Sequence, residues 1–109
     1  MKFGGTSVAH LDRIKKAAIK VKSKILKDKK KVIVVVSAMS GVTNNLVKNF
    51  NKISNDINNP EYDIILSTGE QYSSGVMSVV LNKLGIKSRS LLGWQIPIIT
   101  DDKYGKARI

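Results

Sequence analysis

Residues 11–27 carry apolar and basic side chains with the period of an α-helix. At about 100° per residue, one face is apolar and carries Leu11, Ile14, Ala18, Val21 and Ile25. The opposite face is cationic and carries Arg13, Lys16, Lys20, Lys24 and Lys27. The pattern predicts an amphipathic helix that packs through its apolar face and keeps its basic face in water.

The apolar run that follows does not alternate with polar residues. Residues 32–36 read VIVVV, so the segment is apolar on both faces of a pleated strand. Such runs are typical of a parallel sheet that helices cover on both sides. We therefore expect a central strand here.

A second helical pattern starts beyond Gly41. Its apolar residues are spaced by four, three and four positions at Leu46, Phe50, Ile53 and Ile57. We expect this helix to end in the asparagine-rich loop around Pro60.

A third helical pattern begins at Asp63. Apolar side chains recur every four residues at Tyr72, Val76, Val80 and Leu84. Gly85 is placed to end the helix, and Ser73, Ser74 and Met77 are interpreted as packing residues.

The segment after Gly85 is strand-like in short pieces, broken by Gly93 and Pro97. We expect Trp94 to lie in the core. Strands and helices thus alternate along the chain, which predicts an α/β fold: a layered sandwich with a mainly parallel central sheet.

Composition limits the kinds of site that the chain can form. Its 109 residues, 42% of them apolar, suffice for one domain, and no apolar run is long enough to span a membrane. The chain has no cysteine and a single histidine, His10, which excludes disulfides, thiolate metal sites and histidine clusters. We expect a cytoplasmic protein without a metal site of its own.

The formal net charge of +11 raises the question of nucleic-acid binding. Lysine, asparagine and isoleucine are all abundant, as a compositional drift toward A/T-rich codons would produce. No aromatic residue interleaves with the lysines of residues 11–31, so the stacking surface of a single-strand binder is missing. A basic nucleic-acid-binding module is disfavoured but stays an alternative.

The first residues, KFGGTS, combine groups that bind anions. Lys2 is a mobile cation, Gly4 and Gly5 let a ligand approach the backbone, and Thr6 and Ser7 are placed where a helix could begin. The same pattern also fits an ordinary strand-to-helix turn. It differs from the G-x-x-x-x-G-K-[ST] phosphate loop, because the lysine precedes the glycines.

Five further segments, together with KFGGTS, form an ordered set of motifs along the chain. The ordered set KFGGTS, SAMSGVTNNL, LSTGEQ, GWQ, ITDD and ARI resembles the amino-acid kinase family, and within it the branch that phosphorylates aspartate, across essentially the whole chain. The resemblance implies the carbamate kinase-like fold. It also implies that residues 1–109 are the N-terminal portion of a catalytic domain, without the family's later segments and regulatory ACT domains.

The implied reaction is transfer of the ATP γ-phosphoryl group to the side-chain carboxylate of L-aspartate, the first step of lysine, threonine and methionine synthesis. Mg²⁺ would be held mainly through the phosphates of ATP. The implied partners are the rest of the kinase, in cis or in trans, and further copies in a homo-oligomer. Alone, the chain is expected to be inactive and marginally folded.

The resemblance also implies a role for each matching residue. Lys2 would neutralise the phosphates in the transition state, and Phe3, Gly4 and Gly5 would form the ATP-phosphate loop. Side chains of three further residues would hold aspartate: Ser37 and Thr43 through its carboxylates or the transferring group, and Glu70 through its ammonium group.

Other interpretations of the same residues remain open. Ser37 and Thr43 could satisfy backbone groups at the end of a strand and the start of a helix, and Glu70 could be a first-turn helix carboxylate. The substrate could also be that of a glutamate, acetylglutamate or uridylate kinase, although SAMSGVT together with STGEQ argues against these.

Overall fold

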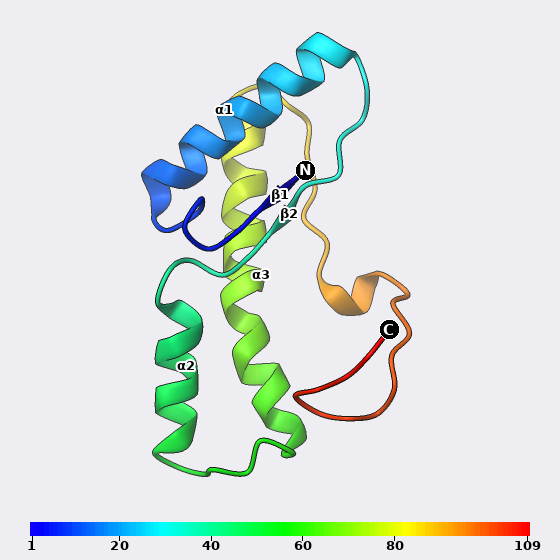
Figure 1. Cartoon of the computed structure of the whole chain (residues 1–109). Coiled ribbons are helices and arrows are strands. Elements are labelled where there is room, and N and C mark those ends of the chain that lie inside the picture. Colours follow the sequence, from blue (N-terminus) through cyan, green and yellow to red (C-terminus); the bar gives the residue numbers. More distant parts are fainter.

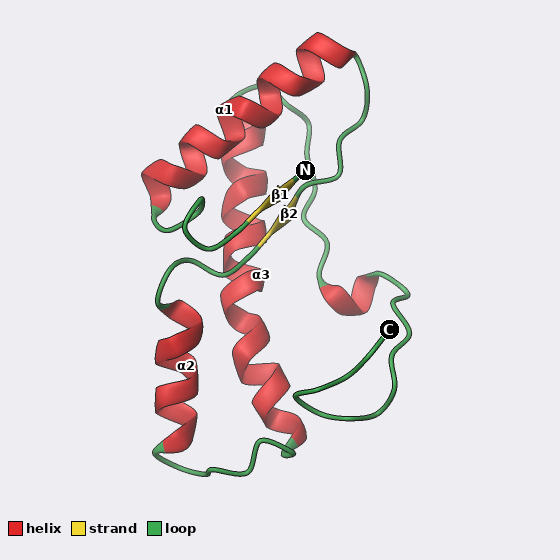
Figure 2. Ribbon diagram, viewed as in Figure 1, coloured by secondary structure: helices red, strands yellow, loops and turns green.

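The computed structural model describes residues 1–109 as helices arranged around a small parallel sheet (Figures 1 and 2). The elements in chain order are β1 (Lys2–Phe3), α1 (Leu11–Asp28), β2 (Val35–Val36), α2 (Val42–Asn51), α3 (Pro60–Lys83) and the 3₁₀-helix η1 (Gly93–Gln95). The α/β class predicted from the sequence is confirmed. None of the helices combines the length and apolar character that crossing a membrane requires.

The sheet is one parallel pair joined by α1 as a crossover helix. Lys2 pairs with Val35 and Phe3 with Val36. The ladder extends by one bond at each end, since the Val35 N–H donates to the Met1 carbonyl at 2.8 Å and the Ser37 N–H to the Phe3 carbonyl at 3.1 Å. The carboxyl ends of β1 and β2 therefore lie side by side.

The main core lies between α1 and α3, which cross each other next to the sheet (Figure 1). Its buried members are Val8, Ile14, Ala17, Ala18, Val21, Met77 and Leu81. The predicted apolar face of α1 is confirmed at its centre, while Leu11 at its first turn is half exposed. The predicted basic face lies in water along its whole length.

The expectation that helices cover both faces of the second strand is wrong for this chain. Val34 and Val36 pack on the core, but Ile33 is 83% exposed and Val35 54% exposed. Successive side chains of a strand point to opposite faces, and α1 and α3 pack on only one of them. Only Val35 and Val36 of the predicted run form ladder-paired strand.

The helix α2 is shorter than its apolar spacing predicted. It ends at Asn51, so Ile53 and Ile57 lie beyond it, and Ile53 is 89% exposed. Beyond Asn51, backbone N–H groups donate to nearby side chains instead of to helical carbonyl groups. The Asp56 N–H donates to Ser54 Oγ, and the Asn58 N–H donates to Asp56 Oδ1. Such local turns compete with a helix.

The helix α3 starts earlier than predicted, because Asn59 caps it and Pro60 occupies its first position. Its end is as expected: Gly85 has φ +81°, and the Ile86 N–H donates to the Leu81 carbonyl at 2.9 Å, as in a Schellman motif.

The buried row of α3 lies one position C-terminal to the predicted one. Tyr72 is 57% exposed, and the buried residues are Gly69, Ser73, Met77 and Leu81. The missing side chain of Gly69 lets the helix approach the loop after β2. The packing role predicted for Ser73 and Met77 is confirmed.

The segment after α3 forms no strand. Hydrogen bonds from Ser88 to Ser78 and Asn82 tie it along α3, away from any ladder partner. Trp94 lies in η1 and is 69% exposed, so the expectation that it belongs to the core is wrong.

Candidate active site

The predicted site residues gather at the carboxyl ends of the two strands. Two loops start there, residues 4–10 after β1 and residues 37–41 after β2, and α3 passes beside the second loop (Figure 1). In α/β folds, ligands bind at this edge of a parallel sheet.

Lys2 and the loop after β1 form a cationic, donor-rich edge. Lys2 Nζ lies 3.6 Å from the position that a Cβ on Gly4 would occupy. The backbone N–H groups of Gly4, Gly5 and Thr6 donate no hydrogen bond within the chain. Three free amides next to one ammonium group are suited to phosphate oxygens.

The helix dipole expected at Thr6 and Ser7 is not there. Both residues lie in a turn in which the Ser7 N–H donates to the Gly4 carbonyl at 2.9 Å, and α1 begins only at Leu11. The turn itself, rather than a helix N-terminus, therefore supplies the donors at this edge.

Two glycines bring the loops together around Ala38. A Cβ on Gly5 would stand 3.2 Å from the Ala38 carbonyl oxygen, and one on Gly69 would stand only 2.8 Å from the Ala38 Cβ. The second distance is shorter than any van der Waals contact allows. Gly69 is thus required where α3 meets the loop after β2.

This close approach fixes the position of Glu70. Its Oε1 accepts a hydrogen bond from the Ala38 N–H at 3.2 Å, and the side chain remains exposed. Glu70 lies near the middle of α3, so its interpretation as a first-turn helix carboxylate is wrong. A carboxylate accepts several hydrogen bonds, so Glu70 can bind a cation while it holds Ala38.

Ser37 and Thr43 flank the N-terminus of α2. Neither hydroxyl takes part in a hydrogen bond within the chain, and no side chain caps the helix. The N-cap is Gly41, with φ +80°, and the N–H groups of Thr43 and Asn44 are free. The first turn carries no acidic residue, so these amides and the helix dipole are available to an anion.

The structure therefore brings all the predicted residues to one edge: Lys2, Phe3, Gly4, Gly5, Ser37, Thr43 and Glu70. Sequence reasoning missed Gly69, Ala38 and the free amides of α2. The one available signal was the position of Gly69 directly before Glu70 within a helical pattern, where glycine is costly without a packing reason.

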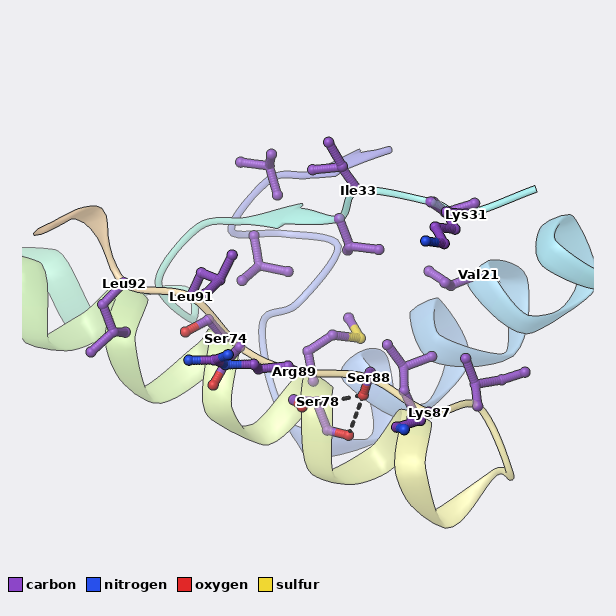
Figure 3. Close-up of a pocket in the computed structure, with 18 of the residues that line it drawn as sticks. Val21, Lys31, Ile33, Ser74, Ser78, Lys87, Ser88, Arg89, Leu91 and Leu92 are labelled. Carbon is purple, nitrogen blue, oxygen red and sulfur yellow. Dashed lines mark hydrogen bonds between the residues drawn. The ribbon is translucent and has the colours of Figure 1, made fainter. Parts of the chain in front are cut away.

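A large groove opens next to this site. It has a volume of about 1080 Å³ and lies between β2, α3 and the segment after α3 (Figure 3). Glu70, Gln71 and Ser74 line it on the α3 side, and Ile33 and Val35 line it on the sheet side. The chain contains no group of three or more His, Cys, Asp or Glu side chains that could hold a metal ion.

Comparison with known proteins finds relatives along nearly the whole chain. A family model described as "Amino acid kinase family" matches residues 1–108. The chain is 49% identical over 112 residues to the aspartokinase of Rickettsia felis and 44% identical over 108 residues to that of Geobacillus stearothermophilus. Each alignment covers 99% of this chain, but only 27% and 26% of the two relatives.

A solved structure of aspartate kinase from Synechocystis resembles the chain with a TM-score of 0.71 and 40% sequence identity. That match covers 76% of this chain and 14% of the Synechocystis chain. The chain thus spans about a quarter of the length of the two aspartokinase relatives. The family match over nearly every residue shows that the chain belongs to the amino acid kinase family.

Proposed function

We propose that the chain forms the phosphate-binding and aspartate-binding edge of an aspartokinase. An oxygen of the L-aspartate side-chain carboxylate attacks the γ-phosphorus of ATP, and the bond from that phosphorus to the β–γ bridging oxygen breaks. The products are 4-phospho-L-aspartate and ADP, which leaves with the bonding electron pair. The observation that carries the proposal is Lys2 Nζ beside the loop of three free amides after β1, with the free N-terminus of α2 at the end of the neighbouring loop.

The loop after β1 would bind the ATP phosphates. Phe3 ends β1 and fixes the start of the loop through its ladder bond to Ser37. Gly4 and Gly5 present their amides without side chains that would keep a phosphate away. Lys2 then stabilises the negative charge that spreads over the transferred group, which is the main demand of phosphoryl transfer.

The loop after β2 and the helix α3 would bind aspartate. The free hydroxyls of Ser37 and Thr43 and the amides of α2 suit a carboxylate, and Glu70 suits an ammonium group. Groups that favour opposite charges are thus placed on either side of one site, where they can orient an amino acid. Mg²⁺ fits the site through the phosphates of ATP, where it would neutralise further charge.

The relatives support aspartate over other substrates of the family, since the Rickettsia felis, Geobacillus stearothermophilus and Synechocystis proteins are all aspartokinases. Because the Rickettsia felis protein is about four times as long, the remaining contacts to ATP and aspartate would come from the rest of such an enzyme. We place the reaction in the cytoplasm, where ATP and free aspartate occur together, and in a homo-oligomer of the complete enzyme.

The experiment combines the 109-residue chain with a polypeptide that covers the remaining length of the Rickettsia felis aspartokinase. Acyl phosphate is trapped with hydroxylamine, and ADP release is measured with L-aspartate, L-glutamate, N-acetyl-L-glutamate and UMP as alternative substrates. We expect hydroxamate only with L-aspartate and only when both polypeptides are present. Turnover with another substrate instead would assign the chain to that kinase.

A single substitution tests the role of Lys2 in the same assay. Lys2→Ala should lower turnover by about 10²- to 10³-fold while the aspartate KM changes little, because the cation acts mainly in the transition state. Lys27→Ala, on the solvated face of α1, is the matched control and should leave both constants unchanged. Weaker aspartate binding at normal turnover would contradict the role of Lys2.

A further inference from the structure

A second, smaller hollow lies between β1, the turn after it and α1. It has a volume of about 170 Å³. Its lining residues are Phe3, Ser7, Arg13, Lys16, Ala17 and Lys20. Neighbouring side chains of a strand point to opposite faces, so Phe3 faces this hollow while Lys2 does not line it.

The rim of the hollow carries three cations and no acid. Arg13, Lys16 and Lys20 are spaced by three and four residues, so they lie on one face of α1. None of them forms an ion pair: the two ion pairs of the chain are Lys15–Asp12 and Lys24–Asp28. The like charges repel one another, and an anion between them would relieve that repulsion.

The carboxylate nearest in sequence does not compensate these charges. Asp12 is held by Lys15 at 3.1 Å, and that hydrogen bond and charge lower the pKa of Asp12. Ser7 adds a hydroxyl group that has no partner within the chain, at the mouth of the turn. The floor is formed by the half-buried Phe3 and the buried Ala17 and offers no competing carboxylate.

We propose that this hollow binds a small phosphate-type anion, separately from the Lys2 loop. The size indicates the class of ligand: pockets for organic ligands usually measure about 300 Å³ or more, whereas this volume is that of about six water molecules in the liquid. Inorganic phosphate and pyrophosphate match this volume, whereas a whole nucleotide exceeds it. The proposal does not depend on the aspartokinase reaction, because none of its cations belongs to that site.

A nucleic-acid strand is the competing anion. The basic face of α1 continues through Lys24 and Lys27, but it carries no aromatic side chain on which a base could stack. The three cations that surround a concave space are confined to residues 13–20 of this helix. The geometry therefore favours a small anion at one place over a polyanion along the whole helix.

The experiment is a titration of the isotope-labelled chain, bound to the unlabelled remaining portion of the Rickettsia felis aspartokinase, with inorganic phosphate and with pyrophosphate at constant ionic strength, followed by the backbone amide signals of Ser7 and Ala17. We expect saturable shifts that are larger at these residues than along the rest of α1. Lys16→Gln/Lys20→Gln should weaken pyrophosphate binding by about tenfold or more, because it removes two charged donors. Both substitutions keep helix-forming residues on a solvated face, and circular dichroism checks that the helix remains.

Lys27→Gln is the matched control on the same face and should change the affinity by less than about twofold, as a charge outside the hollow is screened by water. Equal weakening by Lys27→Gln, or equal shifts with sodium chloride, would overturn the proposal. So would loss of binding in Lys2→Ala but not in Lys16→Gln/Lys20→Gln, which would place the anion at the Lys2 loop. A single-stranded oligoribonucleotide that binds more tightly and depends equally on both halves of α1 would assign the face to a polyanion.

Discussion

At the scale of single residues, Gly69 decides where the candidate active site can form. Its missing Cβ lets α3 touch Ala38, and that contact brings Glu70 to the backbone of the loop after β2. The position of the Glu70 carboxylate therefore depends on Gly69, the residue before it. Glu70 and Gly69 are thus one structural feature.

Two glycines of α3 provide a direct test. Gly69→Ala should lower the free energy of unfolding by about 1–3 kcal/mol, because the new Cβ would overlap Ala38 and force the helix and loop apart. Gly75→Ala meets nothing within 4 Å, so it should raise that free energy by about 0.5–1 kcal/mol through helix propensity alone. Urea unfolding of both variants, each combined with the remaining portion of the Rickettsia felis aspartokinase, measures the difference. Equal effects of the two substitutions would show that α3 and the loop are not in contact.

A second prediction at this scale concerns the charge of Glu70. Glu70→Gln keeps an oxygen that can accept from the Ala38 N–H, so the local structure should persist. In the complemented enzyme, the aspartate KM should rise by about tenfold or more, since a bond to a charged group is lost, while the ATP KM stays nearly constant. An equal rise of both KM values would instead give Glu70 a structural role.

At the scale of elements, the sequence predicted α1 well, because the helix has a single apolar face and packs through it mainly against one element, α3. It placed the buried row of α3 one residue off, because that row includes Gly69 and Ser73, which hydrophobic periodicity does not count. Ile53 and Ile57 continued the spacing of α2, but Ser54 and Asp56 turn the chain first. Apolar spacing carries no information on such side-chain-to-backbone bonds.

The site was predictable for a different reason. Lys2, Ser37 and Glu70 lie in short motifs whose order resembles one family, so their common location followed from the motifs. The free amides of α2 and the contact at Ala38 could not be predicted from the motifs, because both depend on backbone geometry. The exposure of Ile33 and Val35 could not be predicted from the apolar run either. The sequence of an apolar strand is the same whether or not another element packs on both of its faces.

The first turn of α1 allows a prediction about pH. The hydrogen bond and charge of Lys15 lower the pKa of Asp12 below its ordinary value of 3.8. This pair therefore stabilises α1 above that value, and its contribution is lost as the pH falls through the lowered pKa. Lys15→Gln should move the pKa of Asp12, measured by NMR of its carboxyl carbon, back toward 3.8. An unchanged pKa would mean that the ion pair does not form in solution.

At the scale of the whole molecule, little of the chain is buried. Only 11 of the 109 residues are buried, and the molecule measures 47 × 29 × 17 Å, so the core is small for this length. A groove of about 1080 Å³ with an apolar sheet face remains open. Burial of apolar surface is the main favourable term in folding, which implies low stability.

We therefore expect the isolated chain to show no aspartate-dependent ADP release and a broad, weakly cooperative thermal transition. Addition of the remaining portion of the Rickettsia felis aspartokinase should sharpen the transition and restore nucleotide binding together, because the same segments would cover the groove and complete the site. Scanning calorimetry and an ADP assay measure the two effects. Robust turnover by the chain alone would contradict this prediction.

The helix α3 carries two separate cores. Met77 and Leu81 pack against α1 near its end, whereas Tyr62 near its start meets the buried Phe50 of α2 edge to face, with ring centroids 5.0 Å apart. Lys2 belongs to the first half of the molecule and Thr43 to the second, and Gly69 lies at the joint between them. Bending at this joint would change the gap between the ammonium group and the helix N-terminus. In the proposed enzyme, a substrate that contacts both the ammonium group and the helix N-terminus would hold the two halves of the molecule at a fixed separation.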